Sequence, residues 1–243
     1  MKVVATYSIK GGVGKTSAAV NLGALAARDG LRTVIWDLDP QGAASYLLRI
    51  KPKVKGGSRK LIRGKREPLD VMKGTDIEGL DLLPADFSYR HLDIQLDKGK
   101  QPLEGIARVL AQLDGGYDLA ILDCPPSISL VSESVFAAAD LLLVPLVPST
   151  LSARTHEQLQ TFLATRPAPA VEVLAFFSMF DRRKNLHKEL MGTLPAAAAA
   201  IPSASAVELM GVKRAPLVVT QPRSPAALAY AELWAELRRA ISV

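Results

Sequence analysis

The chain has 243 residues, of which 49% are hydrophobic and 22% are charged, and its formal net charge is +6. This composition fits one large α/β domain with a well-buried core, and no apolar run approaches the roughly 18 residues of a membrane-spanning helix. The single cysteine, Cys124, excludes an internal disulfide, and a predicted strand follows Met1 without a signal-peptide pattern, so we expect a cytoplasmic protein.

The positive charge is concentrated in one segment. Residues 49–66 contain nine basic residues and no acidic one, whereas the rest of the chain contains 21 basic and 24 acidic residues. The high isoelectric point therefore reflects this segment rather than a generally basic surface. Because proline and glycine interrupt the segment, we expect a mobile excursion over about residues 51–65 that is too polar to form a core element.

Apolar strands alternate with helical segments, a pattern typical of a doubly wound, mostly parallel sheet with helices on both faces. The predicted strands are residues 3–7, 33–37, 80–83, 117–123, 141–146 and 171–178. The predicted helices are residues 15–29, 103–113, 130–139 and 152–164, one that begins at 186–191, and an amphipathic helix over 225–241 with Leu228, Leu233, Trp234, Leu237 and Ile241 on one side. We find no repeat and no linker, so we expect a single domain over residues 1–243.

Residues 10–17, KGGVGKTS, join the first predicted strand to the first predicted helix. The glycines of this loop can adopt backbone angles that direct several N–H groups toward one anion. The helix adds the positive end of its dipole and Lys15 adds a full charge. The Thr16 hydroxyl is suited to hold Mg²⁺ between two phosphates. The sequence therefore predicts a nucleotide-binding loop.

The loop departs from the usual G-x-x-x-x-G-K-[ST] pattern, because Ile9 occupies the position of the first glycine and a second lysine, Lys10, opens the loop. In this respect it resembles the deviant Walker A box of the ParA/MinD superfamily of nucleoside triphosphatases. The resemblance implies a P-loop fold that binds ATP and Mg²⁺ through Lys10, Gly11, Gly12, Val13, Gly14, Lys15, Thr16 and Ser17. In the family, the signature lysine reaches across an ATP-bound homodimer to the partner's phosphates, and Gly12 must stay small so that the two loops can approach.

Acidic residues follow two of the predicted strands. Asp37 and Asp39 stand at the carboxyl end of the second strand, where open α/β sheets place ligand chemistry, and such a pair can orient a water and contribute to a Mg²⁺ shell. The DLDPQG segment resembles the family's switch I, which implies that Asp39 is needed for hydrolysis, with Asp37 in support. Asp123 follows four apolar residues like a Walker B acid that holds Mg²⁺ through a water. The next residues, Cys124 to Ser127, resemble switch II, with Cys124 as a small buried residue.

Further segments match the family in order and spacing, at residues 83–86, 144–148, 179–183, 201–202 and 221–224. The family pattern also implies a short helix at 43–48 and a strand at 196–200, although an alanine run by itself favours helix. Pro202 occupies the position where the family's backbone borders the adenine. Ala204 stands where the family often has an asparagine that contacts the base, so base selectivity stays open.

ParA-like dimers bind DNA without sequence preference through basic residues of their C-terminal half. The resemblance implies four candidates for this contact, Arg183, Lys213, Arg214 and Arg223. The basic run at 49–66 could extend a DNA surface, dock an acidic partner or act as a solubilising loop, and the sequence does not decide between them. Binding of this kind would fall steeply with salt.

The resemblance implies a weak, partner-stimulated ATPase that dimerises with ATP, associates with nucleoid DNA, and positions a plasmid, a chromosome or a protein cluster through a ParB-like or cargo-adaptor protein. No N-terminal repressor extension is expected. The alternative is a MinD-like membrane-cycling regulator, but the last helix is expected to cover the sheet, so we expect no stable membrane anchor. Iron–sulfur relatives need two ligand cysteines and are excluded. Amidating relatives need substrate machinery for which the sequence offers no candidate residues.

Overall fold

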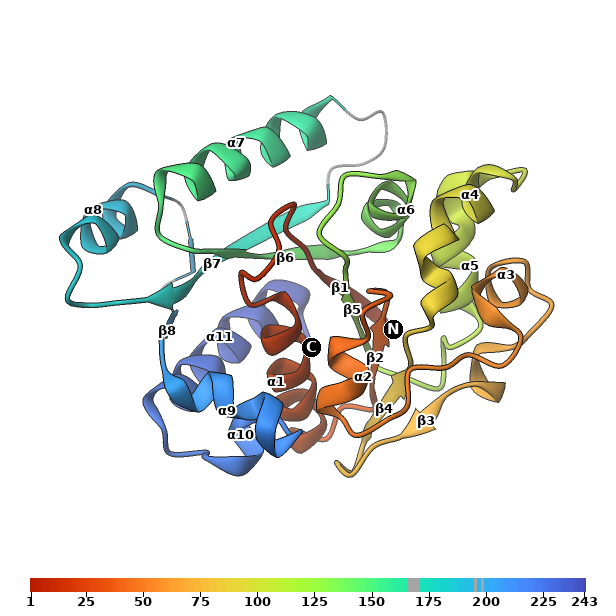
Figure 1. Cartoon of the computed structure of the whole chain (residues 1–243), viewed down its shortest axis with the longest axis horizontal. Coiled ribbons are helices and arrows are strands. Elements are labelled where there is room, and N and C mark those ends of the chain that lie inside the picture. Colours follow the sequence, from red (N-terminus) through yellow and green to blue (C-terminus); the bar gives the residue numbers. More distant parts are fainter. Residues whose placement is uncertain (166–170, 195, 198) are drawn as a thin grey trace.

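The structure is a computed structural model that describes residues 1–165, 171–194, 196–197 and 199–243 (Figure 1). At its centre lies one eight-stranded sheet with the order β3-β4-β2-β5-β1-β6-β7-β8. The strands are β1 (Lys2–Thr6), β2 (Thr33–Asp37), β3 (Lys73–Gly74), β4 (Leu80–Leu83), β5 (Leu119–Asp123), β6 (Leu141–Leu146), β7 (Glu172–Phe180) and β8 (Ala200–Pro202). Among the described strands, only β3 pairs antiparallel with its neighbour, which confirms the predicted doubly wound, mostly parallel sheet.

Helices cover both faces of the sheet (Figure 1). The α-helices are α1 (Lys15–Arg28), α2 (Ala43–Leu47), α3 (Gly57–Ile62), α4 (Leu92–Asp97), α5 (Gly105–Ala111), α6 (Leu130–Ala138), α7 (Thr150–Ala164), α8 (Asn185–Thr193), α9 (Ser205–Lys213), α10 (Leu217–Thr220) and α11 (Pro225–Ile241), and the 3₁₀ turns are η1 (Pro68–Asp70), η2 (Phe87–His91) and η3 (Pro102–Glu104). No described helix combines the length and the apolarity that a membrane span requires.

The core has two layers, because successive side chains along each strand point to opposite faces of the sheet. On β1, for example, Val4 joins a cluster with α1 and α11, whereas Val3 and Ala5 join a cluster with α4, α5 and α6. Successive strand residues point to opposite faces, so a strand buried on both faces must be apolar throughout. This is why the central strands could be recognised as continuous apolar runs.

The apolar side of α11 belongs to this core. Leu233, Trp234, Leu237 and Ile241 are at most 3% exposed, and the indole N–H of Trp234 donates to Asp29 Oδ2 at 2.8 Å. The placement of Leu228 on the same side is wrong, because this side chain is 52% exposed. Leu228 lies close to the start of the helix, where α11 borders a cavity rather than the sheet.

Several other elements differ from the prediction. The strand expected at 196–200 begins four residues later, as β8, and residue 198 lies outside the described residues. The helix expected at 103–113 is divided into η3 and the shorter α5. Helices α4, α9 and α10 were not predicted, because each has nine residues or fewer and short helices leave little room for a periodic pattern.

The basic segment is folded, and the expectation that it lacks a core element is wrong. Within it lies α3, and Val54, Leu61 and Ile62 are at most 5% exposed. The Ser58 hydroxyl donates to Gln95 Oε1 at 2.8 Å, and the Val54 N–H donates to Asp86 Oδ2 at 2.8 Å. Three apolar residues, flanked by basic ones, are enough to anchor the segment against η2, α4 and α5.

This anchoring can be tested by truncating Leu61, which is fully buried. Leu61→Ala is expected to lower the free energy of unfolding by about 2–5 kcal/mol, because it removes buried methyl groups and leaves a cavity. The neighbouring exposed Lys60→Ala should change it by less than about 0.5 kcal/mol. Urea denaturation measures both. Equal effects of the two substitutions would contradict a folded segment.

Candidate functional site

Residues 10–14 lie in the connection between the carboxyl end of β1 and α1, and residues 15–17 begin α1. Gly12 and Gly14 have φ angles of 70° and 99°, in the left-handed region that favours glycine. A Cβ at Gly14 would also lie 2.7 Å from Ser178 Oγ on β7, whereas one at Gly12 would meet no atom within 4 Å. No side chain caps the N-terminus of α1, so its first N–H groups can bind an anion.

The two lysines of the loop differ in their surroundings. The Lys15 residue is only 6% exposed, and its ammonium donates to the Lys10 carbonyl at 3.2 Å. Burial lowers the pKa of Lys15, while the nearby Asp123 acts in the opposite direction. A buried ammonium with a single neutral acceptor is poorly compensated, and a bound phosphate would supply the missing negative charge. Lys10, in contrast, is exposed, and its ammonium has no partner among the described residues.

Two buried aspartates end neighbouring strands. Asp37 on β2 and Asp123 on β5 are partners in register, and both residues are 0% exposed. Asp123 accepts hydrogen bonds from the hydroxyls of Thr16, at 2.7 Å, and Thr6, at 3.3 Å. Burial, followed by the charge of Asp37, raises the pKa of Asp123 to about 8, and burial raises the pKa of Asp37 to about 6. Without a ligand, this site therefore disfavours two ionised carboxylates.

The donor set fits a magnesium ion held together with a phosphate. Asp37 Oδ1 is buried and has no hydrogen-bond partner in the described structure. A cation beside Asp37 and Asp123 would favour the ionised forms of both. Among the described residues, no three His, Cys, Asp or Glu side chains gather into a metal site. Magnesium needs no such set, because it commonly uses one or two carboxylates together with substrate phosphates.

Asp39 lies in the loop between β2 and α2 and is half-buried. Its Oδ1 accepts the Gln41 N–H at 2.9 Å, which leaves the other carboxylate oxygen available. Cys124 is 1% exposed, burial raises the pKa of its thiol, and its thiol donates weakly to the Leu122 carbonyl at 3.6 Å. This agrees with the prediction that Cys124 is a small buried residue.

Ser45 is a site residue that sequence reasoning missed. Its N–H and its hydroxyl both donate to Asp37 Oδ2 at 2.7 Å, and its hydroxyl accepts the Ala85 N–H at 2.9 Å. The first turn of α2 is thereby fixed to β2 and to the end of β4. The only signal was a serine in the first turn of the predicted helix, which by itself is common.

Two arginines join α2 to α9. Arg49 and Arg214 each follow the last turn of a helix in a left-handed conformation, with φ of 60° and 49°. Arg49 donates to the carbonyls of Lys213 and Arg214, both at 3.1 Å. In return, Arg214 donates to the Tyr46 carbonyl at 3.0 Å and places its guanidinium 4.6 Å from the centre of the Tyr46 ring. Each arginine thus binds carbonyls at the C-terminal end of the other helix.

The four residues predicted to contact DNA are placed as follows. Lys213 and Arg214 end α9 beside Arg49, and Arg214 is engaged with Tyr46. Arg183 follows β7 and forms an ion pair with Asp181 at 2.9 Å. Arg223 is exposed between α10 and α11. Their predicted role stays a prediction.

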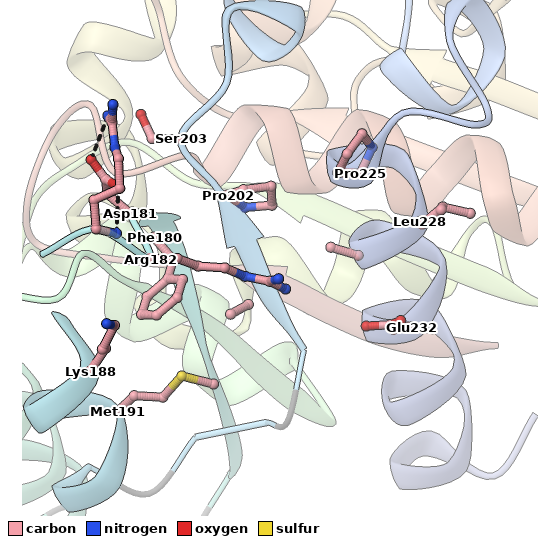
Figure 2. Close-up of a pocket in the computed structure, with 13 residues that line it drawn as sticks. Phe180, Asp181, Arg182, Lys188, Met191, Pro202, Ser203, Pro225, Leu228 and Glu232 are labelled. Carbon is pink, nitrogen blue, oxygen red and sulfur yellow. Dashed lines mark hydrogen bonds and ion pairs between the residues drawn. The ribbon is translucent and has the colours of Figure 1, made fainter.

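Pro202 lines a cavity of about 830 Å³ at the β8 edge of the sheet, and Figure 2 shows the walls that α8 and α11 contribute. The side chain of Arg182 extends across it toward α11 (Figure 2). None of residues 10–17 lines this cavity. A second cavity, of about 730 Å³, lies between α2 and α9 and reaches Thr16 and Ser17. A base position beside Pro202 therefore stays a prediction.

The hydrogen bonds of Ser45 can be tested by measuring the stability of a variant that lacks them. Ser45→Ala is expected to lower the free energy of unfolding by about 1–3 kcal/mol, because it leaves the buried Ala85 N–H without its acceptor and removes a donor to Asp37. Ser203→Ala, on an exposed residue, serves as the control and should have an effect within about 0.5 kcal/mol. Denaturant titration compares the two, and a neutral Ser45→Ala would mean that these contacts contribute little.

The chain matches one family model and several known proteins. A family model described as an AAA domain matches residues 1–166. The chain is 30% identical over 197 residues to the chromosome partitioning protein ParA of Caulobacter vibrioides, which covers 78% of this chain and 74% of that protein. It is 35% identical over 145 residues to the sporulation initiation inhibitor protein Soj of Bacillus subtilis, which covers 59% of this chain but only 57% of the length of Soj.

Among solved structures, the fold is similar to that of cobyrinic acid a,c-diamide synthase from Mycobacterium smegmatis, determined with bound ADP and magnesium. The TM-score is 0.83 at 28% sequence identity, and the superposition covers 98% of this chain and 94% of the other. The likeness extends over nearly the whole sheet and its helices, beyond the N-terminal part matched by the family model.

Proposed function

The chain belongs to the AAA-domain family matched by its first 166 residues and to the ParA/MinD superfamily, and on this premise we propose that it is an ATPase that positions a cargo. In this proposal, residues 1–243 act as one domain, two copies dimerise around ATP, the dimer binds DNA without sequence preference, and a ParB-like or adaptor protein stimulates hydrolysis. The observation that supports it most directly is the geometry of the phosphate site, where Thr16 contacts Asp123 at 2.7 Å beside the buried Lys15.

Each residue of the site has a proposed task. The N–H groups of residues 11–17 and the Lys15 ammonium bind the phosphates of ATP. Thr16 and Asp123, with Asp39 nearby, hold Mg²⁺, which supplies charge neutralisation of the phosphates when bound. Asp39 uses its free carboxylate oxygen to orient the attacking water. Asp37, fixed by Ser45, supports the position of the loop that contains Asp39.

Lys10 is proposed to act in the partner's site. Its side chain is exposed and unpaired in the described structure, while its own carbonyl and N–H are held by Lys15 and Ser8. The adjacent Gly12 leaves open space on the same loop. An ammonium projecting from a fixed backbone next to an open surface is well placed to reach a second copy of the chain across bound ATP.

The alternatives have less support. A membrane-cycling, MinD-like regulator needs a surface that inserts into lipid, and the apolar side of α11 is used in the core. The name of the similar structure from Mycobacterium smegmatis suggests an amidating enzyme as another alternative. Such a reaction needs a second substrate beside the phosphate site. A cavity of about 730 Å³ does reach Thr16 and Ser17, but the sequence offers no candidate residues for the substrate machinery of an amidating enzyme.

Substitution of each loop lysine is expected to impair a different step, either dimerisation or ATP binding. Lys10→Ala is expected to retain ATP binding but to weaken ATP-dependent dimerisation about tenfold to a hundredfold, because a charge-assisted hydrogen bond contributes about 1.5–3 kcal/mol. Lys15→Ala, the matched variant, should lose ATP binding itself. Nucleotide titration and sedimentation velocity with a slowly hydrolysed ATP analogue measure these effects. If Lys10→Ala dimerises like the wild type, the proposed role of Lys10 is wrong.

If the protein binds DNA as proposed, its affinity for DNA should depend on the bound nucleotide and on the salt concentration. The wild type with ATP should bind plain duplex DNA more tightly than with ADP, and the affinity should fall steeply with salt. Arg223→Ala should weaken this binding without affecting dimerisation, whereas Arg154→Ala, an exposed arginine on α7, should not.

Fluorescence anisotropy of labelled duplex measures the affinity, and liposome sedimentation is run in parallel. Equal DNA binding with ATP and ADP would contradict the DNA-cycling function. ATP-dependent lipid binding without DNA binding would favour the membrane-cycling alternative.

A further inference from the structure

The basic segment forms an ordered surface with uncompensated positive charge. Of its nine basic residues, Arg49 pairs with Asp76 at 3.4 Å and Arg66 pairs with Asp70 at 2.9 Å. The other seven are exposed and have no acidic partner in the part of the chain that the structure describes. These seven residues, called the basic surface below, are Lys51, Lys53, Lys55, Arg59, Lys60, Arg63 and Lys65.

The backbone beneath this surface is fixed. Leu61 and Ile62 anchor α3 in the core, and Ser58 bonds to both Ser88 and Gln95. Asp86 accepts the Val54 N–H at 2.8 Å and the Ser88 N–H at 2.9 Å. Like charges held together on a fixed backbone repel one another and reduce stability. A solubilising loop needs no such anchoring, so the arrangement favours a bound polyanion.

The kind of polyanion follows from what the surface lacks. Protein interfaces usually have an apolar or aromatic centre surrounded by polar residues. Between residues 49 and 66, no large apolar side chain is among the exposed ones of the described structure, and Val54, Leu61 and Ile62 point into the core. A segment whose exposed side chains include lysines and arginines but no large apolar residue of its own matches a phosphate backbone, which is bound mainly by charge.

The basic surface is connected to the phosphate site and to α9. Pro52 Cβ lies 2.9 Å from the position that a Cβ on Gly42 would take, so the start of the segment packs against the loop that follows Asp39. Lys51 and Pro52 line the same cavity as Arg214. In the view of Figure 1, α2 lies between α9 and α3. The basic surface thus begins beside the residues already expected to contact DNA and extends away from them.

We propose that the basic surface is a docking site for the phosphate backbone of double-stranded DNA, in addition to the candidates on the C-terminal half. The proposal rests on the proposed DNA-binding function and locates part of the contact. It assigns no base recognition. Packing of Pro52 on the switch I loop gives a reason why this contact should depend on the nucleotide.

The test compares two triple variants of the full chain. Arg59→Ala/Lys60→Ala/Arg63→Ala removes three charges from the basic surface, and Arg28→Ala/Arg154→Ala/Arg239→Ala removes three exposed charges from α1, α7 and α11. Binding of a labelled duplex of random sequence is measured with a slowly hydrolysed ATP analogue at several salt concentrations. The first variant is expected to bind at least about tenfold more weakly at 0.1 M salt, with a salt slope smaller by up to about 2.7. The second should bind like the wild type.

Equal affinity and slope for the wild type and the Arg59/Lys60/Arg63 variant would overturn the proposal while leaving DNA binding intact. Absence of duplex binding by the wild type would instead overturn the proposed function. If the wild type binds polyglutamate but not duplex DNA, and the same triple variant loses this binding, the surface is an acidic-protein site and the proposal is wrong. Thermal unfolding of both variants establishes that they are folded, since all six side chains are exposed.

Discussion

Two carboxylates, Asp37 and Asp123, lie side by side at the ends of adjacent parallel strands, out of contact with water. Moving two like charges into a protein interior is unfavourable, so the arrangement needs either protons or compensating cations. The surrounding residues supply part of the compensation, with donors from Thr16 and Ser45 and the nearby ammonium of Lys15. The remaining deficit is one that a metal ion and a phosphate together would compensate.

The same carboxylates organise the neighbouring elements. Asp37 fixes Ser45 and therefore the first turn of α2, and Ser45 in turn holds the backbone of Ala85 after β4. At its other end, α2 is joined to α9 through Arg49 and Arg214. Through α2, hydrogen bonds thus connect Asp37 to the surface where two candidate DNA contacts lie. Hydrogen bonds at both ends of one short helix are a physical route for coupling between these two places.

The sequence was informative where one local pattern determines the structure. The central strands are apolar throughout because both faces are covered, and the glycines and lysines at 10–17 have few uses other than binding phosphate. Asp37 and Asp123 could be placed at one edge of the sheet because parallel strands end together, and the structure brings them into register. Local sequence was therefore enough to place these two carboxylates together.

Other features depend on distant partners and were missed or misplaced. The buried side of α3 was missed because basic residues surround it in the sequence. Leu61 and Ile62 become part of the core only when η2, α4 and α5 pack on them. Ser45 gains its importance from Asp37 and Ala85, which no spacing reveals. Leu228 fits the apolar side of α11 by periodicity, but at that position the helix borders an open cavity. The resemblance to a family could not supply these contacts either.

The hydrogen bond from the Lys15 ammonium to the Lys10 carbonyl has a further consequence. It joins Lys15, the lysine proposed to bind phosphate, to the backbone of Lys10, whose side chain is exposed. An anion that draws the ammonium away deprives this carbonyl of its partner, and the start of the loop is then held by the Ser8 hydroxyl alone. Anion binding by Lys15 and release of the Lys10 carbonyl would therefore be one event, because both break this 3.2 Å hydrogen bond.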